Sequence, residues 1–291
     1  MHKSNPPILV ETVAQLRELV AAERRAGRTV GFVPTMGALH EGHLSLVRAA
    51  RAECDFTVVS IFVNPSQFGP NEDFSKYPRT LDADIELLAG CETDLVFTPA
   101  AEEVYRPGHD TWVEVGAAAR PLEGECRPGH FRGVATIVLK LLNMVQPDAA
   151  FFGQKDYQQS LVIRRMAADL DLPTEIRVCP IVREPDGLAM SSRNRYLTPS
   201  ARQRALVLWR SLQLAVGLVE QGEHDARTIA ARMRELIETA EDARIDYVAL
   251  ADPETLLPVD TITGPTLAAL AVKIENTRLI DNCILNAVVS E

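Results

Sequence analysis

The first two-thirds of the chain alternate between short apolar runs and longer segments in which apolar residues recur every three or four positions. The apolar runs predict strands buried on both faces, and the wider spacing predicts amphipathic helices. Strands are expected at residues 30–34, 56–64, 94–99, 149–153 and 175–182, and helices at 13–20, 41–52, 81–88, 134–145 and 157–170. This alternation predicts an α/β fold with a Rossmann-like parallel sheet and helices on both faces.

The pattern changes after about residue 185. Thr198-Pro199 is typical of a helix start, and a second helix and three strands are expected after it, at residues 226–240, 244–252, 266–274 and 277–285. Only Glu275-Asn276 separates the last two strands, which indicates a hairpin. We therefore predict two domains, residues 1–185 and a smaller C-terminal α+β domain at residues 186–291.

Composition narrows the class of protein. The 291 residues carry 30 Lys and Arg against 40 Asp and Glu, a net charge of −10, which argues against a general nucleic-acid surface. No signal-peptide pattern or apolar run of membrane-spanning length occurs, so we expect no membrane partner. The five cysteines are widely spaced and include no C-x-x-C pair, which favours a reducing cytoplasm over disulfides or a zinc site.

The stretch PTMGALHEGH connects a predicted strand with a predicted helix. Its two histidines, His40 and His43, could hold a metal, bind a phosphate or simply lie on the surface. Ligands of an open parallel sheet bind where strands end, and a helix N-terminus attracts phosphate. Gly37 and Gly42 have no Cβ and would let a ligand approach the backbone. A zinc protease pattern needs H-E-x-x-H, whereas this stretch is H-E-G-H, and no other His or Cys has a spacing that suggests a third ligand, so we predict a phosphate site and no metal ligands.

Other strand ends carry polar residues that should converge on the same edge of the sheet. Asn64 and Gln67 follow one strand, and Lys155 follows another. Ser191 to Arg193 follow the last strand of this region and offer donors suited to a polyphosphate, while RPGHFRG at 127–133 adds a basic loop. A plain turn, a capped helix start and solvated loops remain the alternatives for these stretches. No Ser–His–Asp or Cys–His set stands out, which fits a substrate that supplies its own nucleophile.

Four longer segments carry a family resemblance: VPTMGALHEGH at 33–43, SIFVNPSQFGPNEDFSKYPRT at 60–80, FFGQKDYQQ at 151–159 and DGLAMSSRNRYL at 186–197. In this order they resemble the pantoate–β-alanine ligase (pantothenate synthetase) family, part of the HIGH-motif nucleotidyltransferase superfamily, over essentially the whole chain. The resemblance implies that ATP and pantoate form pantoyl adenylate and pyrophosphate, after which β-alanine gives pantothenate and AMP. It also implies Mg²⁺ accompanying ATP, a loop that closes over the site, and a homodimer.

The resemblance further implies roles for individual residues. His43 is the family's assigned proton donor, although the physical argument favours stabilising phosphoryl charge together with His40, Lys155 and Arg193. The expected substrate-binding residues are Asn64, Gln67 and Gln159. The expected ATP-binding residues are Met36, Gly37, Ala38, Leu39, His40, Glu41, Gly42, His43, Gly153, Gln154, Lys155, Asp156, Val182, Met190, Ser191, Ser192 and Arg193. Residues 1–185 would bind nucleotide and pantoate, and residues 186–291 would contribute an ATP-site loop and cover the active site.

One position departs from the superfamily pattern. The superfamily often carries a lysine before its serine pair, and Ala189-Met190-Ser191-Ser192-Arg193 lacks it, so Lys155 and Arg193 are expected to take its place.

Three rival functions can be weighed against this family. A cytidylyltransferase would use the HEGH stretch in the same way, but the two glutamines and VNPSQFG argue against it. An aminoacyl-tRNA synthetase fragment is disfavoured by the net charge of −10, and a non-catalytic nucleotide sensor by the presence of all four segments.

Overall fold

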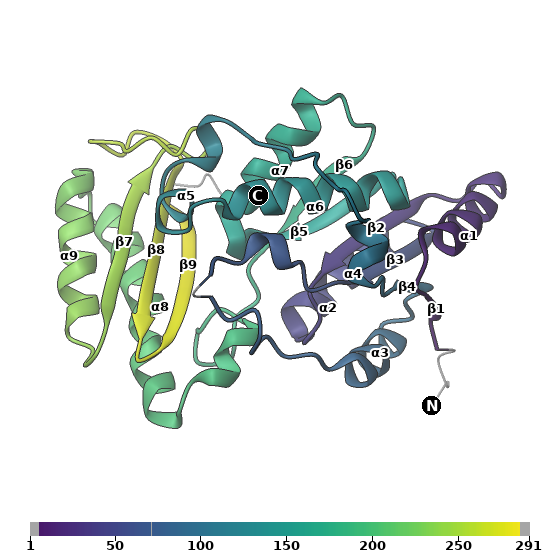
Figure 1. The fold of residues 1–291 in the computed structure, drawn as a ribbon. Coiled ribbons are helices and arrows are strands. Elements are labelled where there is room, and N and C mark those ends of the chain that lie inside the picture. Colours follow the sequence, from purple (N-terminus) through teal and green to yellow (C-terminus); the bar gives the residue numbers. More distant parts are fainter. Residues whose placement is uncertain (1–5, 71, 286–291) are drawn as a thin grey trace. The chain divides into compact units, whose positions relative to one another are not determined.

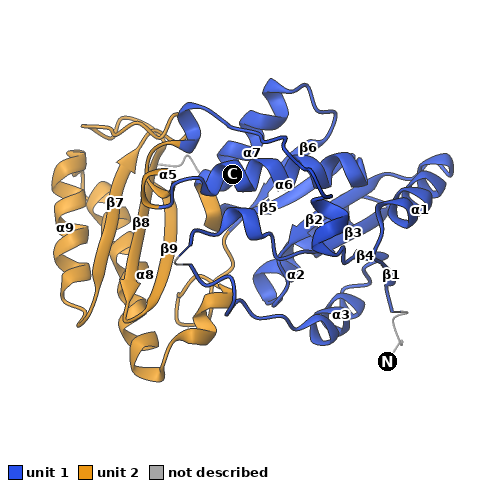
Figure 2. Ribbon diagram, in the orientation of Figure 1, with its two compact units in different colours: residues 1–119, 127–154, 158–180 blue, residues 120–126, 155–157, 181–291 orange. Residues whose placement is uncertain are grey.

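The computed structural model describes residues 6–70 and 72–285, and the chain divides into two compact units (Figure 2). Unit 1 comprises residues 1–119, 127–154 and 158–180, and unit 2 comprises residues 120–126, 155–157 and 181–291. The chain therefore changes unit at residue 181, and two short earlier segments, including Lys155, belong to the C-terminal unit instead of the N-terminal one.

In unit 1, six of the described strands form a parallel sheet in the order β1-β4-β3-β2-β5-β6 (Figure 1). The strands are β1 (Ile8–Val10), β2 (Val30–Thr35), β3 (Phe56–Ile61), β4 (Leu95–Phe97), β5 (Ala149–Gly153) and β6 (Glu175–Cys179). The helical segments of this part of the chain are α1 (Val13–Arg25), α2 (Glu41–Glu53), η1 (Pro65–Gln67), α3 (Leu81–Gly90), α4 (Ala101–Val104), η2 (Ala117–Ala119), α6 (His130–Val145), η3 (Gln154–Asp156) and α7 (Tyr157–Asp169). The predicted parallel α/β sheet is confirmed.

Both faces of this sheet are covered. Phe32 and Val33 are neighbours on β2 and point to opposite faces, yet each is 0% exposed. Val33 packs in one apolar cluster with Val47 of α2 and Phe151 of β5. Burial on two sides is the reason why these strands appear in the sequence as continuous apolar runs.

Several elements differ in extent from the expectation, and three of the differences have an identifiable structural reason. β3 ends at Ile61 instead of residue 64, because the Asn64 side chain caps η1 by accepting from the Ser66 N–H. α6 begins at His130 instead of residue 134, directly after Gly129, whose φ is 82°. β1 was not predicted, since three residues are too few to show a periodicity, and it is formed by pairing with β4.

Unit 2 contains a three-stranded antiparallel sheet in the order β7-β8-β9 among the described residues. Its elements are α5 (Glu123–Cys126), η4 (Ser192–Tyr196), α8 (Pro199–Glu220), α9 (Ala226–Glu238), β7 (Arg244–Ala251), β8 (Thr266–Ile274) and β9 (Thr277–Leu285). Leu212 of α8, Ile229 of α9 and Leu270 of β8 share one apolar core. The hairpin at Glu275-Asn276 and the smaller α+β domain are both confirmed.

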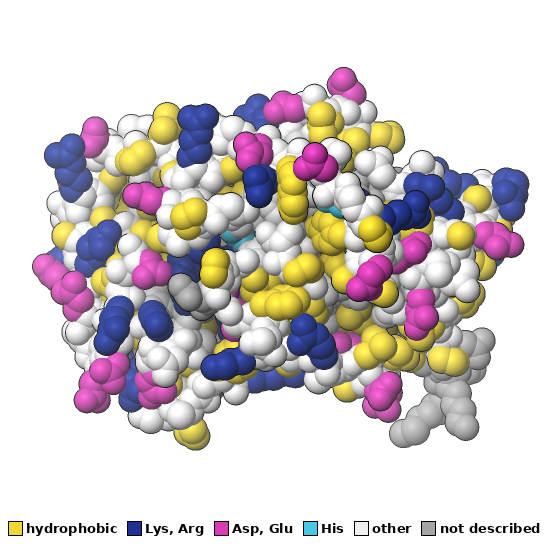
Figure 3. Space-filling view, in the orientation of Figure 1, with side chains coloured by type: hydrophobic (Ala, Val, Ile, Leu, Met, Phe, Trp, Pro, Cys, Tyr) yellow, Lys and Arg dark blue, Asp and Glu magenta, His cyan; other side chains and the backbone are white. Residues whose placement is uncertain are grey.

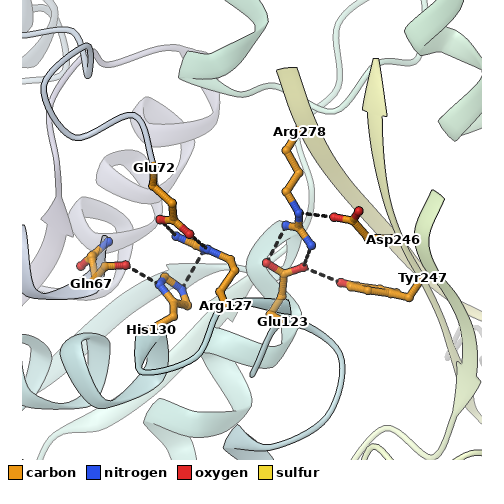
Figure 4. Close-up of polar contacts among 8 residues, drawn as sticks. All are labelled: Gln67, Glu72, Glu123, Arg127, His130, Asp246, Tyr247 and Arg278. Atoms are coloured by element: carbon orange, nitrogen blue, oxygen red, sulfur yellow. Dashed lines mark hydrogen bonds and ion pairs between the residues drawn. The ribbon is translucent and has the colours of Figure 1, made fainter. Parts of the chain in front are cut away.

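An ion pair holds the early segment 120–126 within unit 2 (Figure 4). Glu123 accepts hydrogen bonds of 2.7 and 2.8 Å from Arg278 of β9, and one of 2.9 Å from the Tyr247 hydroxyl of β7. Arg278 also donates to Asp246 at 2.6 Å. Burial and then the Glu123 charge raise the pKa of Tyr247, so its hydroxyl remains a donor. These bonds satisfy a buried carboxylate with partners that are distant in sequence, which no local pattern reveals.

Candidate active site

A buried carboxylate holds the loop between β2 and α2. Asp84 of α3, which is 2% exposed, accepts from the backbone N–H groups of Ala38 and Leu39 at 2.9 and 2.8 Å. Gly37 and Ala38 have left-handed backbone, with φ of +79° and +51°. A Cβ on Gly37 would lie 3.0 Å from both Asp84 and Ile61. The positive φ and the packing of the loop therefore both favour glycine at this position, and the expected approach of a ligand to Gly37 stays a prediction.

The two histidines of the loop lie together at the start of α2. His40 is the N-cap residue, and its Nδ1 accepts the Gly42 N–H at 3.2 Å. That bond assigns the proton of a neutral His40 ring to Nε2. The ring centroids of His40 and His43 are 4.1 Å apart. Glu41, between them in sequence, is exposed and pairs with Arg48 of the same helix. The loop thus brings two imidazoles together at a helix N-terminus, where the partial positive charge favours an anion.

Replacing Asp84 by Asn tests the support under this loop. Asparagine has one acceptor oxygen, so its NH₂ group would face the N–H of Ala38 or Leu39, which can only donate. We expect Asp84→Asn to lower the free energy of unfolding in urea by about 2 kcal/mol, the cost of an unsatisfied buried donor. The matched control, Asp82→Asn, changes an exposed residue of the same helix and should shift it by less than about 0.5 kcal/mol. Equal effects of the two substitutions would contradict the role given to Asp84.

Polar contacts connect the loop after β3 with the loop after β2. Asn64, which is 1% exposed, donates to Gln67 Oε1 at 3.0 Å and to the Gly133 carbonyl of α6 at 3.3 Å. Gln67 Nε2 in turn donates to the Met36 sulfur at 3.1 Å. Met36 was expected at the site from one segment and Asn64 and Gln67 from another, and the structure brings all three together.

A second set of contacts holds the chain around Gln67 (Figure 4). His130 of α6 is hydrogen-bonded through Nδ1 to the Gln67 carbonyl at 2.8 Å, and Arg127 lies 3.1 Å from His130 Nε2. Arg127 also makes two hydrogen bonds of 2.7 Å to Glu72. Burial raises the pKa of the Glu72 carboxyl, but the hydrogen bonds and charge of Arg127 outweigh it, and the net shift is downward. The basic stretch RPGHFRG therefore anchors Gln67 and the segment that follows it.

The other expected residues of unit 1 contribute differently. Ala38 and Leu39 are 0% and 2% exposed, and the backbone N–H groups of both are held by Asp84. Gly153 closes β5 opposite Cys179 of β6. Gln154 follows at the start of η3, and Gln159 lies near the start of α7; Gly153, Gln154 and Gln159 are all half-buried.

In unit 2 a short hairpin carries the serine pair. The Met190 N–H donates to the Val182 carbonyl at 3.0 Å, which places these two expected ATP-site residues side by side. Ser191 then caps η4, its hydroxyl accepting from the Arg193 N–H at 3.3 Å. Ser192 is buried at 8% exposure. The Ser191 side chain is therefore part of a turn, and the same turn fixes the backbone of Arg193.

Strand β9 holds two parts of unit 2 together. Asp281, which is 3% exposed, makes a bidentate pair with Arg183 of the hairpin at 2.6 and 3.0 Å. Asn282, the next residue, donates to the Lys155 carbonyl at 2.9 Å. Lys155 Nζ lies 3.9 Å from the Asp156 carboxylate. The same strand thus positions both the lysine segment and the hairpin that leads to Arg193.

Sequence reasoning missed Asp84, Asp281 and Asn282. A signal for the last two is present, because Asp281-Asn282 interrupts the apolar strand TRLIDNCIL, and polar groups buried in a strand need partners. Asp84 gives no comparable signal, since its helix also carries Asp82 and Glu86.

Other features bear on the chemistry. No group of three or more His, Cys, Asp or Glu residues that could hold a metal occurs within residues 6–70 and 72–285. Over the same described residues, no helix combines the length and apolar character needed to span a membrane. Basic and acidic side chains are interspersed on the face drawn in Figure 3.

Burial raises the pKa of all five free thiols, to about 11 for Cys54 and about 12 for Cys283, so none is an activated nucleophile.

Comparison with known sequences gives one family. A sequence model described as Pantoate-beta-alanine ligase matches residues 8–284. Relatives called pantothenate synthetase from Moorella thermoacetica and Roseiflexus castenholzii are each 56% identical to this chain, over 277 and 278 residues. These alignments cover 95% and 96% of this chain and 98% and 100% of the relatives.

Solved structures agree with the sequences. Pantothenate synthetase from Thermus thermophilus has a TM-score of 0.91 and 47% identity, covering 95% of this chain and 98% of its own. The pantoate–β-alanine ligase of Francisella tularensis, complexed with beta-gamma ATP and β-alanine, has a TM-score of 0.79 and 33% identity, covering 98% and 100%. With the parallel sheet and the paired histidines at the start of α2, these likenesses show that the chain belongs to the pantoate–β-alanine ligase family.

Proposed function

We propose how the residues of this chain divide the work of its family's reaction, the ATP-dependent joining of pantoate to β-alanine. The pantoate carboxylate attacks the α-phosphorus of ATP, and pantoyl adenylate forms as pyrophosphate leaves. The β-alanine amine then attacks the acyl carbon, which gives pantothenate and AMP. The observation that carries the residue assignment is the pairing of His40 and His43 at the start of α2, directly after a parallel strand.

In this proposal His40 and His43 stabilise the negative charge that builds on the phosphoryl oxygens. The His40 cap directs its ring proton to Nε2, and the neighbouring ring at 4.1 Å adds a second donor-bearing group. We favour this role over strict proton donation by His43, because pyrophosphate held by cations needs little protonation to leave. Residues 36–43 form the nucleotide-binding loop, and Asp84 holds the backbone of Ala38 and Leu39 within it.

Gln67 and Gln159 hold pantoate in this proposal. A carboxamide can donate and accept, which suits a substrate with hydroxyl groups and a carboxylate. Asn64 acts through Gln67, because its Nδ2 is engaged by Gln67 and Gly133 and its side chain is 1% exposed. Gln67 would also lie near the bound β-alanine, a substrate that the Francisella tularensis relative was crystallised with.

In unit 2 we assign the phosphate-binding cations to Lys155 and Arg193. They take the place of the lysine that precedes the serine pair in other members of the superfamily. Support comes from β9, since Asn282 holds the Lys155 backbone at 2.9 Å and Asp281 holds the hairpin that precedes Arg193. The other residues proposed to contact ATP are Gly153, Gln154, Asp156, Val182, Met190, Ser191 and Ser192.

Mg²⁺ accompanies ATP in this proposal. The described residues hold no cluster of three or more candidate ligands, and Mg²⁺ at nucleotide sites is bound largely by phosphate oxygens and water. When bound it would neutralise phosphate charge, and Lys155 and Arg193 would add to that effect. We further propose a homodimer and a cytoplasmic location, the latter supported by five free cysteines.

One assay tests the function. The full chain is incubated with ATP, Mg²⁺, pantoate and β-alanine, and AMP is measured. AMP formation that requires both acids is the expected result. Pyrophosphate release with CTP and a phosphorylated alcohol would point to the cytidylyltransferase alternative, and absence of turnover with any of these substrates would reject the ligase.

A further inference from the structure

The orientation of one buried amide decides what the Gln67 side chain can offer a substrate. Asn64 Oδ1 lies 3.3 Å from the Ser66 N–H, a backbone group that can only donate. Asn64 Nδ2 lies 3.3 Å from the Gly133 carbonyl, which can only accept. These two backbone groups exclude the flipped amide, so the Asn64 nitrogen must face Gln67.

The Gln67 amide follows from that of Asn64. The Gln67 atom that lies 3.0 Å from Asn64 Nδ2 must be an acceptor, and it is therefore Oε1. Gln67 Nε2 then points the other way and donates to the Met36 sulfur at 3.1 Å. A thioether is a weak acceptor, so a hydroxyl or carboxylate oxygen of a substrate is a better partner for Nε2. Gln67 is thus presented as a donor.

Tyr105 completes this chain of hydrogen bonds. Its hydroxyl donates to Asn64 Oδ1 at 2.8 Å, the shortest contact of that oxygen, and lies 3.0 Å from the Ser66 hydroxyl. The Ser66 hydroxyl itself donates to Asn64 Oδ1 at 2.9 Å. Burial raises the pKa of Tyr105, with an opposing effect of Ser66, so the phenol keeps its proton at neutral pH.

The Tyr105 ring is held independently of its hydroxyl. The ring packs edge-on against His109, with centroids 5.0 Å apart, and Lys140 Nζ lies 5.5 Å from its centroid. A phenylalanine can occupy the same place, so the hydroxyl can be removed without moving the ring.

We infer that Tyr105 is a positioning residue for pantoate: its hydroxyl helps to hold the Asn64 amide in the orientation that the backbone groups set, and Asn64 turns Gln67 Nε2 toward an acceptor oxygen of the substrate. Tyr105 need not contact the substrate. The inference rests on the proposed function, in which Gln67 binds pantoate, and adds to it the polarity of that contact and the residue that sets it.

Tyr105→Phe tests the inference. We expect the KM and the calorimetric Kd for pantoate to rise by about tenfold, the weight of one hydrogen bond, with the KM for ATP changed by less than about twofold. Ser66→Ala removes the other side-chain donor to Asn64 Oδ1 and should raise the same constants by a smaller factor. The matched control is Tyr247→Phe in unit 2, which also deletes the hydrogen-bonded hydroxyl of a half-buried tyrosine but should leave the pantoate constants unchanged.

A double-mutant cycle separates positioning from general loosening of the fold. In a Gln67→Ala background, Tyr105→Phe should add less than about twofold to the pantoate Kd, because the group through which it acts is gone. Unchanged pantoate binding in Tyr105→Phe, or the same tenfold loss with and without Gln67, would overturn the inference. Failure of the proposed function is a different result, since the unmodified chain would then form no AMP from pantoate and β-alanine.

Discussion

His43→Ala should slow pantoyl adenylate formation by about 100-fold or more, because it removes a group that stabilises phosphoryl charge in the transition state. The substitution should leave the loop in place, since His40, not His43, caps α2, and Asp84 holds the preceding backbone. The measurement is single-turnover release of pyrophosphate from ATP and pantoate without β-alanine, which isolates the first half-reaction.

Two controls accompany this measurement. His224→Ala removes an exposed histidine of unit 2 and should leave the rate unchanged. The second half-reaction, started from prepared pantoyl adenylate and β-alanine, should be nearly as fast in His43→Ala as in the unmodified chain, because no pyrophosphate leaves in that step. Near-normal adenylate formation by His43→Ala would contradict the role assigned to His43 in stabilising phosphoryl charge.

His43→Gln distinguishes charge stabilisation from proton donation. A glutamine keeps an N–H donor but cannot transfer a proton at neutral pH. If His43 stabilises charge, the glutamine variant should be about tenfold faster than the alanine variant, because it keeps one hydrogen bond to the phosphoryl group and such a bond contributes about this factor. If His43 donates a proton to the leaving group, the two variants should be equally slow.

The sheet could be predicted from the sequence because its apolar runs record burial on both faces. Phe32 and Val33 are adjacent and both 0% exposed, a pattern that only a strand covered on two sides requires. The helix starts were also readable where a cap is local, as at Thr198-Pro199. The loop PTMGALHEGH was placed correctly between β2 and α2, because the strand before it and the helix after it both have recognisable patterns.

What supports the site could not be predicted in this way, because the supports act across long stretches of sequence. Asp84 satisfies Ala38 and Leu39, and Tyr105 orients Asn64, but nothing near these residues indicates such partners. Local reasoning also did not reveal a structural reason for Gly37, namely its positive φ and the close approach of Asp84 to its Cα.

A very close backbone contact lies where α6 meets η1. A Cβ added to Gly133 would lie 2.3 Å from the Ser66 carbonyl oxygen and 2.7 Å from the Gln67 Cα, and both of these atoms belong to the backbone. His130, one turn earlier on α6, is bonded to the Gln67 carbonyl at 2.8 Å, so the two segments cannot easily move apart. The closeness of this contact is what places Asn64 within reach of the Gly133 carbonyl.

Gly133→Ala should therefore destabilise the chain by about 2 kcal/mol, as overpacking against an unyielding neighbour does. It should also raise the pantoate KM by more than about tenfold, because relief of the clash displaces Gln67 and breaks the Asn64 bond to Gly133. The free energy of unfolding in urea and the KM for pantoate are the two measurements. An unaltered KM would contradict the link between this contact and the substrate.

The matched control is Gly217→Ala in α8, where an added Cβ meets nothing within 4 Å. Alanine is the better helix former by about 1 kcal/mol, so Gly217→Ala should stabilise the chain. Gly133→Ala gains the same helix propensity, so a net loss of stability there must come from the contact of the new Cβ with the backbone of Ser66 and Gln67. If Gly133→Ala lowers the free energy of unfolding while Gly217→Ala raises it, the loss at Gly133 comes from the contact that positions Gln67. Stabilisation by both substitutions would instead mean that η1 moves freely, and the hydrogen-bonded support proposed for pantoate would lose its basis.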